Sequence, residues 1–236
     1  MGRIRGLVIA LCLLLPACAG AHSSVTAAAC DYADFIRLGG VTYEVADQGV
    51  GRAIGQRDLG PVFARITGNP PTSGDCLSYR PRDGDAAFLA SGSSVYQVTG
   101  YRPSFRLAAS HDGRLRLYEA QEAASARVGA DLLDLAGKVR YLSVNSRRFE
   151  LARIKDRPRV AELVGQVLAA PVRPSSGRAE QHYCFVVFNL ADGTAVRRIL
   201  RPTTGELGPG LFVPPAFTGA VEGALEARQR TCGRNP

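Results

Sequence analysis

The chain has 236 residues, of which 46% are hydrophobic and 21% are charged, a composition typical of a globular protein. Its formal net charge is +8, and all but two of its 29 basic residues are arginine, the exceptions being Lys138 and Lys155. This charge favours attraction to anionic headgroups or cell-wall polyanions, but the arginines form no stripe interleaved with aromatic residues, so it does not predict a nucleic-acid-binding module.

The N-terminus has the pattern of a secretory signal peptide. Arg3 and Arg5 form a basic start, and the apolar run over residues 7–15 follows them. This run is too short to cross a hydrocarbon core as a helix, which takes about 20 residues. A basic start, a short apolar run and small residues at its end predict an export signal. In an ordinary signal of this kind, cleavage would follow Ala21 or Ala29.

The end of the apolar run, Leu15-Pro16-Ala17-Cys18, resembles the lipobox of bacterial lipoproteins. The resemblance covers residues 1–18 only. It implies that residues 1–17 are removed, that Cys18 carries acyl chains such as palmitate, and that the protein is anchored to a membrane of the bacterial cell envelope, on the extracytoplasmic side. Loss of Arg3 and Arg5 lowers the net charge to +6. Residues 18–29, rich in alanine and serine, are then expected to form a flexible tether.

Residues 30–119 are predicted to form a β-rich domain, a compact sheet or small barrel. Frequent Gly, Pro and Asp residues divide short apolar runs at short spacing. Gly39-Gly40 and His111-Asp112-Gly113 are predicted hairpin turns. The predicted strands cover residues 35–38, 41–45, 59–68, 105–109 and 114–119, with two more within 86–101.

Residues 120–137 are predicted to connect this domain to a small α+β domain over residues 138–236, with an antiparallel sheet and two helices. Asp156 is a predicted helix cap, and the apolar stripe behind it marks a helix that ends before Pro171. A run that is apolar on both faces, residues 182–190, predicts a central strand. Further strands are expected over 139–144, 148–154 and 194–201, and a last helix from Pro214-Pro215. The predicted fold class is thus α+β, and the two domains resemble no named family.

Four cysteines remain in the expected mature chain besides Cys18. An even number in an exported protein suggests two disulfides, and four cysteines allow three connectivities. Sequence position favours Cys30–Cys76 and Cys184–Cys232, one bond in each half. A zinc site is not favoured, because the chain has no CxxC pair and His182 is the only histidine near a cysteine.

No sequence motif predicts a catalytic, metal or cofactor site. GxSxG, SxxK and HExxH are absent. His182 beside Glu180 is the one histidine with a neighbouring carboxylate, so it is the best candidate for a general base. The glycines of residues 49–55 and the aspartates of residues 82–85 fit loops better than a nucleotide or calcium site. The aspartates at positions 31 and 34 lack any partner that would mark a glycosidase.

Aromatic and arginine residues gather in one short segment and form a possible binding patch. Exposed aromatic and arginine side chains are enriched at recognition surfaces, whereas alternating aromatics can also line a β-sheet core. The residues of this possible patch are Tyr96, Tyr101, Arg102, Phe105 and Arg106.

The sequence therefore favours a non-enzymatic envelope lipoprotein that binds a partner or acts as an accessory factor. The partner would be another envelope protein or a polyanion of the cell wall. One alternative is a hydrolase of the cell wall or of glycans, in which His182 or a carboxylate pair would line an open cleft. Another is an inhibitor or ligand-presenting module that uses the aromatic and arginine patch.

Overall fold

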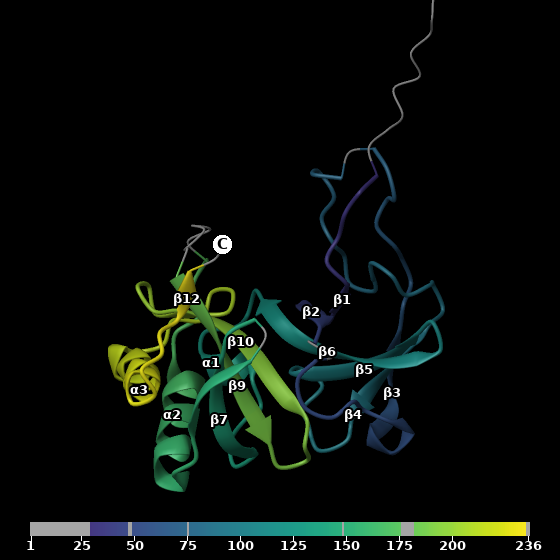
Figure 1. Ribbon diagram of the computed structural model, residues 1–236. Helices are drawn as coiled ribbons and strands as arrows, with labels where there is room; N and C mark the ends of the chain where they lie inside the picture. Colours follow the sequence, from purple (N-terminus) through teal and green to yellow (C-terminus); the bar gives the residue numbers. More distant parts are fainter. Residues whose placement is uncertain (1–28, 47–48, 75, 148, 176–181, 235–236) are drawn as a thin grey trace, which may run out of the picture.

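The computed structural model describes residues 29–46, 49–74, 76–147, 149–175 and 182–234, which form two antiparallel sheets and three helices (Figure 1). This arrangement is consistent with the predicted α+β class. Cys18 and most of the expected tether lie outside the described residues. Within them, no helix is both long and apolar enough to cross a bilayer.

The first sheet has the strand order β1-β2-β6-β5-β4-β3. Two tight turns join its hairpins, as the sequence predicts. Gly39 and Gly40 have φ values of 59° and 76°, and Asp112 and Gly113 have φ values of 50° and 72°, the left-handed region that suits two-residue hairpin loops. The elements of this half are β1 (Phe35–Leu38), β2 (Val41–Val45), the short 3-10 helix η1 (Gln56–Asp58), β3 (Leu59–Arg65), β4 (Ser94–Val98), β5 (Arg106–His111) and β6 (Arg114–Ala123).

One predicted strand of this half is absent. Residues 86–101 contain β4 but no second strand. The segment before Gly92 instead lies against β1: Ala86 forms an isolated bridge with Ile36, and both side chains are fully buried. Ala86 and Leu89 therefore fill the core without joining a ladder, whereas Phe88 between them is 50% exposed.

The second sheet has the order β11-β10-β9-β7-β8, with β12 also paired to β9. The strand predicted to be central, β9, pairs with β7, β10 and β12. Helices α2 and α3 lie together beside this sheet (Figure 1). The elements of this half are α1 (Gly129–Leu132), β7 (Val139–Asn145), β8 (Glu150–Ile154), α2 (Arg157–Ala169), β9 (His182–Leu190), β10 (Ala195–Arg201), β11 (Glu206–Leu207), α3 (Pro215–Glu226) and β12 (Gly233–Arg234).

Helix α2 forms where the sequence predicts it. The Asp156 carboxylate accepts a hydrogen bond from the Arg159 backbone N–H at 3.0 Å, which satisfies one of the free donors at the start of the helix. The apolar stripe is buried at Val160, Leu163 and Val167, and the helix packs mainly on β7. The flank of the helix that carries Ala161 and Gly165 stays exposed and forms one wall of the groove described below.

Both predicted disulfides are present, Cys30–Cys76 and Cys184–Cys232. Cys184 is buried within β9, and Cys232 follows α3. The second disulfide therefore fixes the end of the last helix to the central strand of its sheet.

The segment predicted to connect two domains carries structure of its own. It contains the last residues of β6 and all of α1. Leu132, Leu133 and Leu135 are buried in a hydrophobic core that includes residues of both sheets. The division into two domains remains a prediction.

Candidate functional site

The aromatic and arginine residues expected to form a patch do not share one exposed surface. Phe105 and Arg106 are each 0% exposed, Tyr96 and Tyr101 are half-buried, and Arg102 is exposed. The hypothesis of an exposed patch is therefore corrected, because two of its five members belong to the interior.

Arg106 instead belongs to a buried ionic network between the two sheets. Its guanidinium donates to one oxygen of the Glu119 carboxylate at 2.6 Å and 3.1 Å. It also donates to the Thr194 hydroxyl at 2.8 Å and to the Ala195 carbonyl at 2.7 Å. Arg198 of β10 donates to the other Glu119 oxygen at 2.8 Å. One buried carboxylate is thus shared by two guanidinium groups from different sheets, which gives the network a structural role.

Three other members of the expected patch, Tyr101, Phe105 and Arg102, contact this network or the nearby backbone. The Arg106 guanidinium lies 4.7 Å from the centroid of the Tyr101 ring and 5.0 Å from that of the Phe105 ring. Burial raises the pKa of Tyr101 to about 12, so its hydroxyl keeps its proton and donates to Asp192 at 2.9 Å. Arg102 donates to backbone carbonyls in and after α1.

The histidine and carboxylate candidates are spread over the molecule. His182 is exposed at the start of β9, and Glu180 lies outside the described residues, so their pairing remains a prediction. The Asp34 carboxylate accepts from Arg116 at 2.7 Å, and Asp85 is buried and accepts from the Tyr79 hydroxyl at 2.6 Å. Across the described ranges, no three His, Cys, Asp or Glu side chains gather where they could hold a metal ion.

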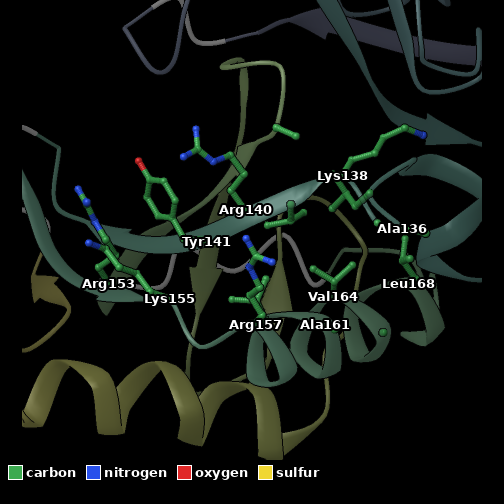
Figure 2. Close-up of a pocket in the computed structure, with 16 residues that line it drawn as sticks. Ala136, Lys138, Arg140, Tyr141, Arg153, Lys155, Arg157, Ala161, Val164 and Leu168 are labelled. Carbon is green, nitrogen blue, oxygen red and sulfur yellow. The ribbon is translucent and has the colours of Figure 1, made fainter.

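The largest cavity described here is a groove of about 920 Å³ between α2 and the first residues of β7, which we call the α2–β7 groove (Figure 2). Its volume is that of a typical small-molecule site. Strand β8, the turn before β7 and Ala191 complete its walls. Sequence reasoning missed this site, whose lining comes from three separate stretches of the chain, residues 135–141, residues 153–168 and Ala191.

The groove exists because strand β8 is short. Its last residue, Ile154, pairs with Leu142 of β7, so residues 139–141 of β7 have a strand partner only in β9. The chain leaves the sheet at this point to begin α2. Small residues then keep the space open, above all Ala161 and Gly165 on the exposed side of the helix. A Cβ added to Gly165 would meet no atom within 4 Å.

A β-bulge sets the position of Arg140 at this groove. Val139 pairs with Leu190 and Tyr141 pairs with Asn189, so Arg140 is the additional residue in β7. Bulges of this kind redirect a side chain that would otherwise alternate with its neighbours. Arg140 lines the groove, and Figure 2 shows it on β7 beside Tyr141, with Arg157 extending from the first turn of α2 towards the same strand.

Five cationic side chains line the α2–β7 groove, and no acidic side chain does. Two of the cations have carboxylate partners just outside it. Three others form no ion pair with any residue that the structure describes. The partnered cations are Lys138, 2.6 Å from Asp134, and Arg153, 2.7 Å from Glu150; the unpartnered ones are Arg140, Lys155 and Arg157, all exposed.

Although two of its five cations form ion pairs, the groove remains strongly positive. Burial would raise the pKa of Asp134, but hydrogen bonds from Lys138 and the Arg102 backbone lower it overall. The hydrogen bond to Glu150 raises the pKa of Arg153, against the smaller effect of burial. Each cation with its carboxylate partner contributes little net charge, so the three unpartnered cations dominate the local potential.

The chemistry of the lining suits the binding of an anion. Guanidinium groups donate two parallel hydrogen bonds to phosphate or carboxylate oxygens, and lysine adds a compact charge. The described residues that line the groove include no Ser, Thr, Cys, His, Asp or Glu, and Tyr141 supplies the one hydroxyl. The groove thus offers cations and apolar surface to a ligand.

No protein-family model, no curated protein and no solved structure matches this chain. The site is therefore interpreted from its own geometry and charge.

Proposed function

We propose that this protein is a lipid-anchored protein of the bacterial cell envelope that works by binding, and that the α2–β7 groove binds anionic headgroups. The observation that carries this proposal is the set of five cations around a groove that no carboxylate lines. Both lysines of the chain, Lys138 and Lys155, belong to that set.

The proposed anchor would place the groove close to its ligand. The lipobox-like sequence supports acylation at Cys18, and the two disulfides fit an oxidising compartment outside the cytoplasm. A basic protein held near a bilayer meets anionic headgroups at high local concentration. Anchor and groove would then act on the same surface.

Acylation of Cys18 is tested by metabolic labelling with an alkyne fatty acid. We expect the wild-type chain to take up the label and Cys18→Ala to lose it, because the thiol is the attachment point. An unlabelled wild-type chain, or full labelling of Cys18→Ala, would rule out this anchor.

Binding by the groove is tested by co-sedimentation of the mature chain with lipid vesicles, using Cys18→Ala so that no acyl chain contributes. We expect binding to vesicles that contain phosphatidylglycerol and little binding to pure phosphatidylcholine. Changing Arg140, Lys155 and Arg157 to Gln should weaken the binding by about 100-fold, since each cation near an anionic surface contributes about 1 kcal/mol.

The matched control changes Arg57, Arg114 and Arg228 to Gln. These three arginines are exposed and lie outside the groove, so the control loses the same net charge. It should bind vesicles nearly as well as the parent chain. Equal loss in both triple variants would mean that net charge, and not the groove, attracts the protein to the bilayer.

A further inference from the structure

The α2–β7 groove is amphipathic along its length. On the side of α2 that borders it, Ala161 and Gly165 are exposed and Leu168 is half-buried. Val160 and Val164 lie beneath them and are only 3% and 5% exposed. Positions 160–168 extend over about 12 Å of helix. Across the groove, Val139 supplies half-buried apolar surface, and Leu135 is fully buried behind it. An apolar strip thus continues from the cations at the start of the helix.

The cations are concentrated at one end of this strip. Arg157 is the first residue of α2, Arg153 lies in β8, and Lys155 lies in the short connection between the two elements. In Figure 2, Arg153 and Lys155 lie near Tyr141 at one end of the groove, and Arg157 lies between them and Val164. Leu168 and Lys138 lie at the other end. A ligand with a charged head and an apolar tail would match this order.

We infer that the groove binds a single anionic phospholipid molecule, with its phosphate at Arg140, Lys155 and Arg157 and one acyl chain along the apolar strip of α2. This inference rests on the proposed function and adds the class of ligand. A free phosphate would use only the cationic end. A lipid would occupy both ends of the groove, whose volume is about 920 Å³.

The acyl chain should contribute strongly to affinity. Each methylene that leaves water strengthens binding about fourfold. A short-chain lipid that buries a few methylenes should therefore bind more than tenfold tighter than its headgroup alone. A zwitterionic lipid with the same chains should bind more weakly, because it brings no net negative charge to the three unpartnered cations.

Titration calorimetry of the mature Cys18→Ala chain tests this inference. The probes are dihexanoyl phosphatidylglycerol, dihexanoyl phosphatidylcholine and glycerol phosphate, all used as monomers in solution. We expect phosphatidylglycerol to bind at least tenfold tighter than either of the others. Shorter chains on the same headgroup should lower the affinity stepwise, a comparison that requires no variant.

Filling the groove should distinguish the binding of the acyl chain from the binding of the headgroup. Gly165→Leu adds a side chain where the structure has open space, so it should weaken the binding of dihexanoyl phosphatidylglycerol at least tenfold and leave that of glycerol phosphate within about twofold. Gly223→Leu is the matched control, because Gly223 is also an exposed helical glycine with open space around it and lies outside the groove. It should bind like the parent chain.

The outcomes distinguish this inference from the proposed function. If glycerol phosphate binds as tightly as the lipid, or if Gly165→Leu binds the lipid unchanged, the groove does not hold an acyl chain, and anionic binding can still stand. If none of the three probes binds but anionic vesicles do, the inference is wrong and surface binding remains. Loss of vesicle binding as well would remove the proposed function itself.

Discussion

Replacing Glu119 with glutamine is expected to destabilise the protein by about 3–5 kcal/mol. Glu119 is 1% exposed and is the only carboxylate within hydrogen-bonding distance of Arg106 and Arg198 in the described structure. Glutamine keeps the shape of the side chain but removes its charge. Two buried guanidinium groups would then lack a counter-ion, which is the costly case for ions removed from water.

The same change should also weaken the contact between the two sheets. Arg106 and Glu119 belong to β5 and β6, whereas Arg198 belongs to β10. The network is thus an ionic link across the sheet–sheet contact. Urea denaturation would measure the effect as a lower transition midpoint.

A matched control is Glu162→Gln, which removes the same charge from the exposed pair with Arg159. Exposed pairs of this kind contribute less than about 1 kcal/mol, so its midpoint should remain close to that of the wild type. A Glu119→Gln variant as stable as this control would show that the network contributes little, and would contradict its role between the sheets.

Removing the Cys184–Cys232 disulfide should destabilise the protein by about 4 kcal/mol. The bond closes a loop with a sequence separation of 48, and the cost of closing a loop of this length sets the estimate. Changing both cysteines to alanine is the suitable test, because Cys184 is buried and a serine hydroxyl there would lack a partner. The measurement is again urea denaturation under oxidising conditions.

The first disulfide provides the comparison. Cys30–Cys76 has a sequence separation of 46, so chain entropy alone assigns it nearly the same stabilisation. If entropy dominates, the two double-alanine variants should lose similar stability. A loss below about 1 kcal/mol for the Cys184 and Cys232 variant would show that the bond does not hold α3 to β9.

Local signals in the sequence predicted most of the secondary structure. The Gly39-Gly40 turn depends on two glycines that adopt positive φ values, a property of the residues themselves. The start of α2 likewise depends on Asp156 and on an apolar stripe within the same segment. Such features need no information from distant parts of the chain. The disulfide pairing followed from sequence position alone and is also confirmed.

The groove could not be predicted in this way, because tertiary pairing creates it. The β-bulge at Arg140 depends on the register between β7 and β9, and the open space depends on where β8 ends. One signal was available in the sequence. Residues 138–159 contain eight basic and two acidic residues. This local excess of positive charge was overlooked because arginines occur along the whole chain.

The groove was present but not predicted, whereas the aromatic and arginine patch was predicted as an exposed surface that the structure does not have. Alternation in Tyr101-Arg102 and Phe105-Arg106 suggested exposed arginines, but Arg106 is buried by a partner thirteen residues away, Glu119, and by β10. A sequence pattern that assigns charged residues to solvent does not predict a buried arginine with such partners. The competing interpretation, that these residues line the core, applies to Phe105 and Arg106.

The central claim is that anionic lipid occupies the α2–β7 groove, and the two lysines of the chain allow the most direct measurement. Lys138 and Lys155 both line the groove, so acetylation of lysine, followed by peptide mass spectrometry, reports on this site. With saturating dihexanoyl phosphatidylglycerol, acetylation of both lysines should slow markedly, and phosphatidylcholine at the same concentration should slow it less. Unchanged acetylation rates at both lysines while the lipid is shown to be bound would place the ligand elsewhere and contradict the account.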